Sequence, residues 1–348
     1  MNSPKIMFHG KGKEKRRSVA VLMGGPSHEH EVSIKSGKNV VSGLDRAKYD
    51  VKQIYISKKG EWDTDIKDVS KMADVAFIAM HGTYGEDGTV QALLEAEKIP
   101  YTGSNAATSA LAMNKYLSLR TFQDHGFIVP HSFLVSHGEW LNPPSADRPA
   151  AERLREVNSI FDRARHYAGY PFVVKPNASG SSVAVTIVKA PEEFEQAMEA
   201  AFAHSRHVLI QSYVRGREVT CGVLDHGFPA SAFALLPTEI IPRQSHFFDY
   251  EEKYRADGAY EITPARFPAP ILQHIQRAAV GLHKALNCRG FSRSDFIVDE
   301  LGAVVVLEIN TIPGLTEQSL LPKAALAHGI SFPSLLELLI EGALPNRF

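Results

Sequence analysis

The chain has 348 residues, of which 44% are hydrophobic and 22% are charged, a composition that excludes a largely disordered or collagen-like protein. Its length predicts two or three domains rather than one. The 38 Lys and Arg residues nearly balance the 39 Asp and Glu residues, and six of the basic ones lie within residues 1–17. The rest of the chain is therefore mildly acidic, which disfavours a nucleic-acid-binding groove.

Cross-links and targeting signals are sparse. Two cysteines, Cys221 and Cys288, are too few for a disulfide framework or a four-ligand zinc site. No stretch approaches the ~20 apolar residues that span a bilayer. Residues 1–17 lack the apolar core of a secretory signal and are typical of a disordered basic tail, with a weak contact to an acidic surface as the alternative. We expect a cytoplasmic protein that binds neither membranes nor nucleic acid.

The first hundred residues alternate short apolar runs with helix-like patterns. We expect strands over residues 18–22, 51–56, 75–80 and 99–101, with helices following Gly25 through Val40 and over 89–97. Strands that alternate with helices are typical of a parallel βαβ sheet, whose site lies at the C-terminal ends of its strands.

The pattern then becomes richer in β-structure. We expect further strands over residues 172–175, 183–188, 208–213, 218–224, 230–236, 291–298 and 304–309, and helices over 191–203 and 270–286. Prolines between residues 143 and 149 indicate a surface loop. Residues 237–264 are polar and aromatic without periodicity, which predicts a loop whose length is typical of a functional segment.

Polar side chains end two neighbouring predicted strands near the C-terminus. Arg293 and Asp295 lie on one strand, and Glu308 and Asn310 end the next. Carboxylate and amide oxygens are hard ligands of the kind that Mg²⁺ prefers beside phosphate. The plainer alternative is a surface ion pair between Arg293 and Asp295.

Three lysines are candidates for phosphate binding. Lys115 and Lys175 follow apolar runs that we interpret as strands, and Lys253 lies in the long loop. Each alone is more typical of a solvated surface charge, but together with the carboxylates they predict a nucleoside triphosphate site. The short loop Gly180-Ser181-Ser182 could cover phosphates with its N–H groups. No Walker-type phosphate loop and no Gly-x-Gly-x-x-Gly motif is present, which disfavours a dinucleotide enzyme.

Two acidic and histidine-containing segments follow predicted strands. The run His28-Glu29-His30-Glu31 lacks the spacing of a helical metal site. We interpret Glu31 as the residue that opens a helix after the glycine turn, where its carboxylate could meet a substrate ammonium. His81 ends the third strand and leads into a helix N-terminus, which favours anionic groups.

Seven ordered motifs, within residues 24–33, 81–89, 101–115, 175–183, 249–254, 293–295 and 308–320, resemble those of the D-alanine–D-alanine ligases of the ATP-grasp superfamily. The match runs from about Ser18 to the C-terminal helix. The resemblance implies an α/β (α+β) ATP-grasp fold of three domains, with a Rossmann-like parallel sheet in the first and ATP held between the other two. The basic tail covers residues 1–17, and the three implied domains cover residues 18–112, 113–208 and 209–348.

The resemblance also implies a two-step reaction and its site residues. One D-alanine carboxylate attacks the γ-phosphate of ATP to form an acylphosphate; the amine of a second D-alanine then attacks the acyl carbon and expels phosphate, giving a peptidoglycan precursor. The residues implied for ATP are Lys115, Lys175, Gln211, Tyr213, Val214, Glu218 and Lys253. Those implied for two Mg²⁺ or Mn²⁺ ions are Asp295, Glu308 and Asn310.

The remaining implied residues contact the amino acids. The set implied for catalysis is Glu31, Ser181, Tyr254, Arg293 and the backbone N–H of Gly314. The set implied for substrate binding is His81, Lys253, Ser319 and Leu320. In this scheme Glu31 and His81 bind the first D-alanine, Arg293 and Gly314 stabilise the oxyanion, and Ser319 with the Leu320 amide holds the second carboxylate.

The chain departs from the family pattern at three positions. Gln211 stands where Glu is usual, at the segment that meets adenine; Ala184 replaces a common Gly, and Leu315 a common Met. None removes a reacting group. The alternatives are a ligase that joins D-alanine to D-serine or D-lactate, or another amino-acid pair, and a silent nucleotide-binding protein. Tyr254 favours an amine acceptor, and the family resemblance suggests a homodimer.

Overall fold

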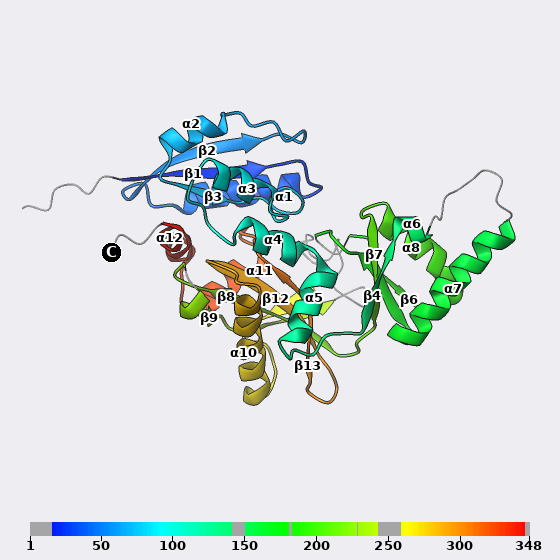
Figure 1. The fold of residues 1–348 in the computed structure, drawn as a ribbon. Coiled ribbons are helices and arrows are strands. Elements are labelled where there is room, and N and C mark those ends of the chain that lie inside the picture. Colours follow the sequence, from blue (N-terminus) through cyan, green and yellow to red (C-terminus); the bar gives the residue numbers. More distant parts are fainter. Residues whose placement is uncertain (1–15, 141–149, 181–182, 228, 243–258, 345–348) are drawn as a thin grey trace, which may run out of the picture.

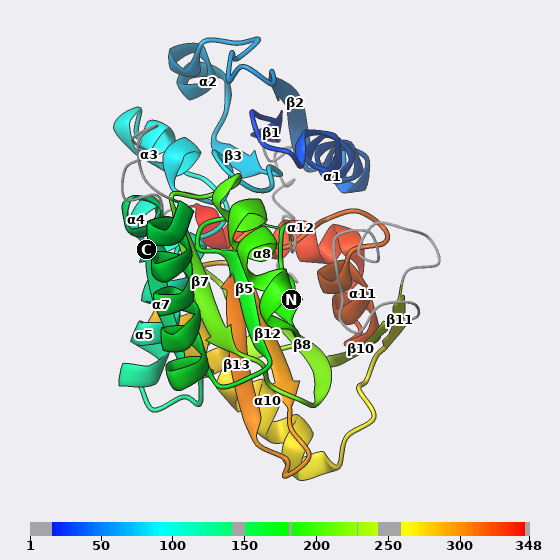
Figure 2. The ribbon, with the colours of Figure 1, turned by 90° about the vertical axis from the view of Figure 1, so that its right-hand side faces the viewer.

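The computed structural model describes residues 16–140, 150–180, 183–227, 229–242 and 259–344. Ser181, Lys253 and Tyr254, three of the predicted site residues, lie outside these ranges, as do the predicted proline-rich loop and nearly all of the predicted tail. The described chain folds into three sheets with separate cores, as Figures 1 and 2 show.

The N-terminal sheet is parallel, as predicted. β1 (Arg17–Gly24) lies between β2 (Tyr49–Ile56) and β3 (Val75–Ile78). The residues from Val19 to Leu22 of β1 are fully buried, because β1 is the central strand and helices pack against the sheet. Those helices are α1 (His30–Gly43), α2 (Ile66–Met72) and α3 (Thr89–Ala96). The predicted strand at 99–101 is reduced to one parallel bridge between Ala76 and Tyr101.

The central sheet is antiparallel, in the order β4-β7-β5-β6. Its strands are β4 (Ser132–Ser136), β5 (Phe172–Pro176), β6 (Thr186–Val188) and β7 (His207–Ser212). Its helical segments are α6 (His137–Trp140), α7 (Ala150–Ala168), η1 (Pro191–Glu193) and α8 (Phe194–Phe202). Figure 1 shows α7 and α8 on the face of this sheet that is turned away from the C-terminal sheet.

The C-terminal sheet follows the order β11-β10-β8-β12-β13, with β9 beside β8. Its strands are β8 (Arg217–Leu224), β9 (Phe233–Ala234), β10 (Thr238–Pro242), β11 (Ala259–Ile262), β12 (Phe291–Val298) and β13 (Val304–Asn310). The helices α4 (Ala106–Met113), α5 (Lys115–Asp124) and α10 (Ala269–Ala285) pack against it, and η2 (Pro229–Ser231) precedes β9.

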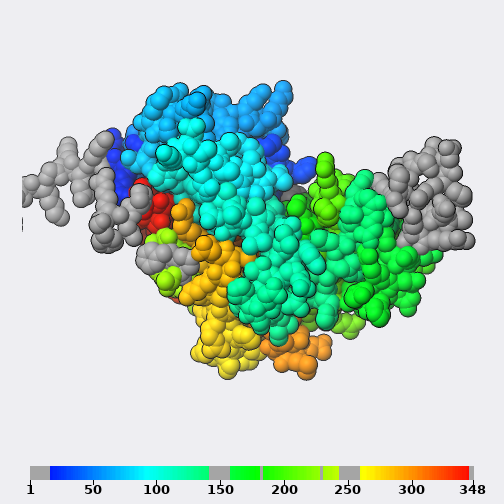
Figure 3. Space-filling model, in the orientation of Figure 1, coloured from blue at the N-terminus to red at the C-terminus, as the bar shows by residue number. Residues whose placement is uncertain are grey.

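The C-terminal helices pack against the parallel N-terminal sheet. α11 (Leu320–Ala327) and α12 (Phe332–Ala343) share one apolar core with the parallel sheet. The space-filling view in Figure 3 shows the N-terminal part of the chain (blue) seated over the C-terminal part (yellow and orange), with the central part (green) projecting to one side. Within the described ranges no single helix is long and apolar enough to cross a membrane, although α11 and α12, bent by 105°, would pass as a pair by length and composition.

Three sequence-based expectations were wrong in detail. Residues 106–113 form the helix α4, so Lys115 begins a helix and does not end a strand. The predicted loop 237–264 contains β10 and β11 at its two ends. The predicted strand at 230–236 shortens to two residues after η2. The predicted fold class is confirmed.

Candidate active site

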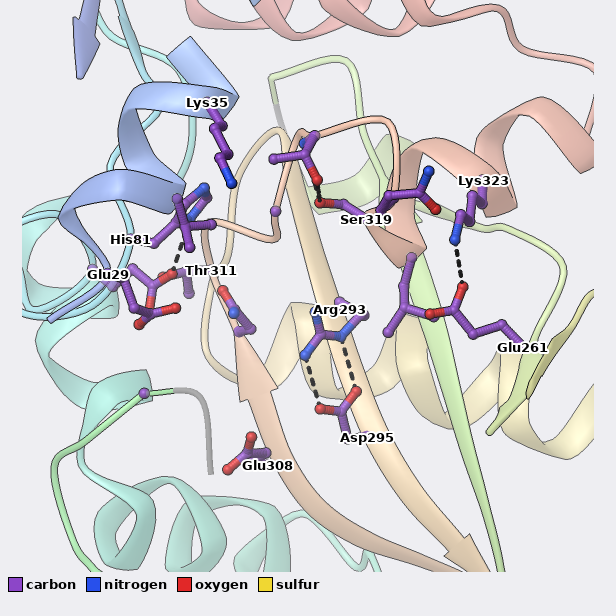
Figure 4. Close-up of a pocket in the computed structure, with 18 of the residues that line it drawn as sticks. Glu29, Lys35, His81, Glu261, Arg293, Asp295, Glu308, Thr311, Ser319 and Lys323 are labelled. Carbon is purple, nitrogen blue, oxygen red and sulfur yellow. Dashed lines mark hydrogen bonds and ion pairs between the residues drawn. The ribbon is translucent and has the colours of Figure 1, made fainter. Parts of the chain in front are cut away.

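A cavity of about 1180 Å³ lies where the three parts of the chain meet (Figure 4). Its walls come from α1, from the segment after β3, from the start of α5, from Ser179 and Gly180, from the ends of β12 and β13, and from the segment that leads into α11. The cavity carries charges of both signs and therefore suits a zwitterionic or polyanionic ligand.

The wall made by β12 and β13 contains the predicted carboxylate cluster. Asp295 and Glu308 are direct cross-strand partners, as are Arg293 and Asn310. Arg293 holds Asp295 through two parallel hydrogen bonds of 2.9 Å, and Thr220 donates a third at 2.6 Å. The ion pair between Arg293 and Asp295 is therefore present, although it is largely buried and not at the surface.

The guanidinium of Arg293 keeps its charge in this setting. Burial opposes that charge, but the neighbouring Asp295 and, farther away, Glu308 outweigh burial and raise the pKa of Arg293. A fixed cation beside two carboxylates can stabilise an oxyanion that forms during a reaction.

Lys115 connects this wall to the loop after β5. α5 begins at this lysine because the Asn114 side chain caps the helix, accepting from the N–H of Leu117. The Lys115 Nζ donates to the Ser179 carbonyl at 2.7 Å and lies 3.3 Å from the Glu308 carboxylate. The lysine thus sits between the start of the predicted phosphate loop and the predicted metal ligands.

The opposite wall contains a buried acidic group that sequence reasoning missed. Glu29 is 7% exposed, and its carboxylate does not cap its own helix. It lies so close to two glycines that a β-carbon would meet Oε2 at 3.0 Å on Gly82 and at 2.6 Å on Gly180. Its position in Figure 4 is beside His81.

His81 and Glu86 form a buried pair behind Glu29. The His81 Nδ1 lies 3.6 Å from the Glu86 carboxylate, and its Nε2 lies 2.8 Å from the Ser36 hydroxyl. Burial would lower the pKa of His81, but Glu86 and Glu29 outweigh it and raise that pKa. Burial raises the pKa of Glu86. The pair therefore retains a proton to higher pH than the isolated groups would.

Glu31 lies close to its expected place at the start of a helix, but its side chain is mostly exposed. Helix α1 begins at His30, so Glu31 lies in its first turn, at the rim of the cavity. Its side chain is 69% exposed and forms an ion pair with Lys58 at 3.2 Å. One sequence signal favours Glu29. It directly precedes the first helical residue, a position at which polar residues are common.

The third side of the cavity is the predicted acceptor region. Ser319 accepts from the N–H of Thr316 at 3.0 Å, and a β-carbon on Gly314 would meet its Oγ at 2.6 Å. Ser319 precedes α11, and Leu320 is the first residue of that helix. The segment is held by α1, where Asn39 donates to the Leu315 carbonyl at 2.7 Å.

Five of the residues predicted for ATP are not among those that line the large cavity. Lys175 and Gln211 are buried on β5 and β7, and Val214 and Glu218 are half-buried. Tyr213 lines a smaller pocket of about 380 Å³, together with Tyr170, Pro171, Lys189 and Arg215. The further cavity residues that sequence reasoning did not name include Lys35, Lys38, Glu261 and Lys323.

The metal-binding capacity of the site rests on oxygen donors. In the part of the chain that the structure describes, no group of three or more His, Cys, Asp or Glu side chains gathers in a metal-binding arrangement. Asp295 and Glu308 with the Asn310 amide supply two carboxylates and one carbonyl, which fit a hard cation that takes its other ligands from phosphate.

Family models match both ends of the chain. The model of the D-ala D-ala ligase C-terminus matches residues 149–341, and that of the D-ala D-ala ligase N-terminus matches residues 18–73 and 63–104. The D-alanine–D-alanine ligase of Geotalea uraniireducens is 41% identical over 331 residues, which cover 94% of this chain and 96% of that protein.

Solved structures of similar proteins share the whole fold. The D-alanine–D-alanine ligase of Bacillus anthracis complexed with ATP is 32% identical, with a TM-score of 0.73 over 94% of this chain and 97% of that one. The VanG D-Ala:D-Ser ligase of Enterococcus faecalis is 31% identical, with a TM-score of 0.76 over 94% and 99%.

Proposed function

This chain belongs to the D-alanine–D-alanine ligase family, and we propose that it joins two molecules of D-alanine at the expense of ATP, releasing ADP and phosphate. The observation that carries the proposal is a cavity with Arg293 and the Asp295–Glu308 pair on one wall and the Glu29–His81–Glu86 group on another. The product is D-alanyl-D-alanine, a peptidoglycan precursor.

The first step is a phosphoryl transfer, which depends mainly on positioning and on neutralisation of charge. The carboxylate of the first D-alanine attacks the γ-phosphorus of ATP, the bond to the bridging oxygen breaks, and ADP leaves. Lys115, placed between the Ser179 carbonyl and Glu308, is suited to hold phosphate oxygens during this step.

We assign the ammonium group of the first D-alanine to Glu29 instead of Glu31. Glu29 is a buried carboxylate that lines the cavity, whereas Glu31 is mostly exposed. A buried carboxylate binds an ammonium more strongly than an exposed one because water screens it less. The buried His81–Glu86 pair lies in the same wall of the cavity and is suited to position the same substrate.

A divalent cation fits the opposite wall. Asp295, Glu308 and Asn310 would hold Mg²⁺ or Mn²⁺, and Lys115 and Arg293, which neutralise the two carboxylates in this structure, would then be available to phosphate and to the acyl oxygen. When bound, the metal supplies positive charge that stabilises the transferring phosphoryl group.

The second step forms the peptide bond. The amine of the second D-alanine attacks the acyl carbon, phosphate leaves, and Arg293 with the Gly314 N–H stabilises the oxyanion of the tetrahedral intermediate. Ser319 and the Leu320 N–H, at the start of α11, are suited to hold the second carboxylate away from the reacting centre.

The test is substrate-dependent release of ADP at fixed ATP, with D-alanine, D-serine, D-lactate and L-alanine offered separately and in pairs with D-alanine. We expect D-alanine alone to support turnover and mass spectrometry to identify the dipeptide. Turnover that requires D-serine or D-lactate would assign a different acceptor, and turnover with L-alanine but not D-alanine would overturn the proposal.

The same resemblance leads us to propose a cytoplasmic homodimer. Sedimentation velocity of the purified chain distinguishes a dimer from a monomer, and fractionation of cells that express it tests the compartment.

A further inference from the structure

Gln211 carries a buried polar group without a partner. The residue is 2% exposed, and within the described ranges its Nε2 atom has no hydrogen-bond partner. A buried amide nitrogen without a partner costs free energy, because the water that it loses on folding is not replaced. Such a group in a native fold calls for a ligand or a functional reason.

The alternation of β7 fixes the direction of this side chain. Val208 and Ile210 belong to the core formed with α7 and α8, whereas Leu209, two residues before Gln211, belongs to the core of the C-terminal sheet. Because side chains alternate along a strand, Gln211 shares the Leu209 face. Figure 1 shows that this face is turned toward the C-terminal sheet.

The phosphate-binding candidate Lys175 lies on the same face. On β5, Phe172 and Val174 belong to the helix-side core, which leaves Val173 and Lys175 on the other face. Val173 is the cross-strand partner of Gln211, and Lys175 is that of Leu209. One face of the central sheet thus carries a cation for phosphate and, a short way along, an unpartnered amide.

We infer that the Gln211 amide reads the purine base of the nucleotide and accepts a 6-oxopurine as well as adenine. This inference rests on the proposed ATP site. A side-chain amide carries both a donor and an acceptor and can turn to offer either one. Its carbonyl can accept from the 6-amino group of adenine, and its NH₂ can donate to the 6-oxo group of hypoxanthine or guanine.

A carboxylate at the same position would behave differently. Glutamate, the residue that the family resemblance implies at this position, has only acceptor oxygens when ionised, so it favours a 6-amino group and repels a 6-oxo group. The discrimination arises because the wrong base leaves a buried polar group unpaired. Because the Gln211 amide can also donate to a 6-oxo group, it removes the penalty against a 6-oxopurine. Base selectivity is therefore the property that a glutamine at this position changes.

The experiment compares ATP, ITP and GTP as phosphate donors for D-alanine, with kcat/KM measured for each. ITP carries a 6-oxo group and an N1–H donor where ATP carries a 6-amino group and an N1 acceptor, and GTP has a 2-amino group in addition. We expect the chain to use ITP within about tenfold of ATP, because one hydrogen bond is exchanged for another. Gln211→Glu should lower the ratio of ITP to ATP activity by at least about tenfold.

Two further variants make the result interpretable. Gln273→Glu makes the same chemical change on the exposed surface of α10 and should leave the ratio unchanged. Gln211→Met removes both polar atoms at similar volume and should leave ATP and ITP nearly equal, even if Gln211→Glu fails to fold. Rejection of ITP by more than about 1000-fold, or a ratio that Gln211→Glu does not alter, would overturn the inference.

Binding separates this inference from the proposed activity. If no nucleotide supports turnover, the proposed function fails, but calorimetric titration of ATP and ITP still measures base selectivity. Similar affinities in the unaltered chain and weaker ITP binding in Gln211→Glu would support the inference, whereas equal losses for both nucleotides would contradict it.

Discussion

The carboxylate of Glu29 lies against the backbone of Gly180, so closely that a β-carbon on the glycine would meet Oε2 at 2.6 Å. The two residues lie beside different sheets, since Glu29 precedes α1 and Gly180 follows β5. Their contact places a candidate ammonium-binding group directly beside the loop that is predicted to cover the phosphates.

Gly180→Ala should therefore impair the reaction more than the fold. The added methyl group must displace Glu29 or the loop, and we expect kcat/KM for D-alanine to fall by at least about tenfold, because small displacements of reacting groups are costly. Steady-state kinetics measure the loss. Gly138→Ala, which adds a methyl group where no atom lies within 4 Å, should change nothing; equal activity in both variants would contradict the expected crowding.

Glu29→Gln and Glu31→Gln should have different effects. The first removes a buried charge from the cavity, and we expect the Michaelis constant of the first D-alanine to rise by at least about tenfold, the scale of one hydrogen bond to a charged group. The second removes an exposed ion pair with Lys58, which contributes little. A larger effect of Glu31→Gln would restore Glu31 as the ammonium ligand.

This pair of residues also shows where sequence reasoning stops. Two residues along a helix differ in direction by about 200°, so an uncertainty of one or two residues in the start of α1 decides which glutamate faces the cavity. The run from His28 to Glu31 contains no apolar residue that would fix this phase.

The parts that could be predicted have strong local signals. The bounds of β12 and β13 follow from two β-rich segments on either side of the turn 299–302, and their antiparallel pairing brings Asp295 to Glu308. Residues 106–113 contain four alanines, which favour a helix, and the cap at Asn105, which accepts from the N–H of Thr108, marks where α4 begins. Contacts such as Asn39 to Leu315, 276 residues apart, leave no local pattern.

Glu308→Gln should preserve the fold and remove most of the activity. The substitution removes one carboxylate from the proposed metal ligands, and we expect kcat/KM to fall by at least about 100-fold, with partial recovery at high Mg²⁺. Activity is titrated against Mg²⁺ and Mn²⁺. Glu300→Gln, the same change at an exposed turn, is the control. Full activity of Glu308→Gln at ordinary Mg²⁺ would remove this residue from the ligand set.

Ser319→Ala should weaken binding of the second D-alanine selectively. The hydroxyl does not cap α11, so its removal should not destabilise that helix. We expect the Michaelis constant for the second D-alanine to rise by about tenfold, while that for ATP hardly changes. Ser70→Ala, on the exposed surface of α2, is the matched control. Equal increases for ATP and D-alanine would indicate a general structural role instead.

Asp225 should control the acid stability of the C-terminal part. It is fully buried between His283, at 2.9 Å, and the N–H groups of Gly227 and Gly290, and the other nitrogen of His283 lies 2.8 Å from Ser292. Burial alone would raise the pKa of Asp225, but these partners outweigh it and lower that pKa. The stability that the carboxylate contributes is therefore present above its ordinary pKa of about 4 and is lost as the pH falls through the lower, folded-state value.

Asp225→Asn should lower the free energy of unfolding at pH 7 by about 3 kcal/mol, because it removes the charge of a buried carboxylate that accepts from two backbone N–H groups. The difference in the free energy of unfolding between the variant and the unaltered chain should shrink as the pH falls below about 4, because Asp225 of the unaltered chain is then increasingly protonated and loses its charge. Urea unfolding followed by circular dichroism at several pH values measures both effects. Asp124→Asn, at an exposed position of α5, should change neither. A deficit that stays constant from pH 7 down to pH 3 would show that Asp225 acts through packing and not through its charge.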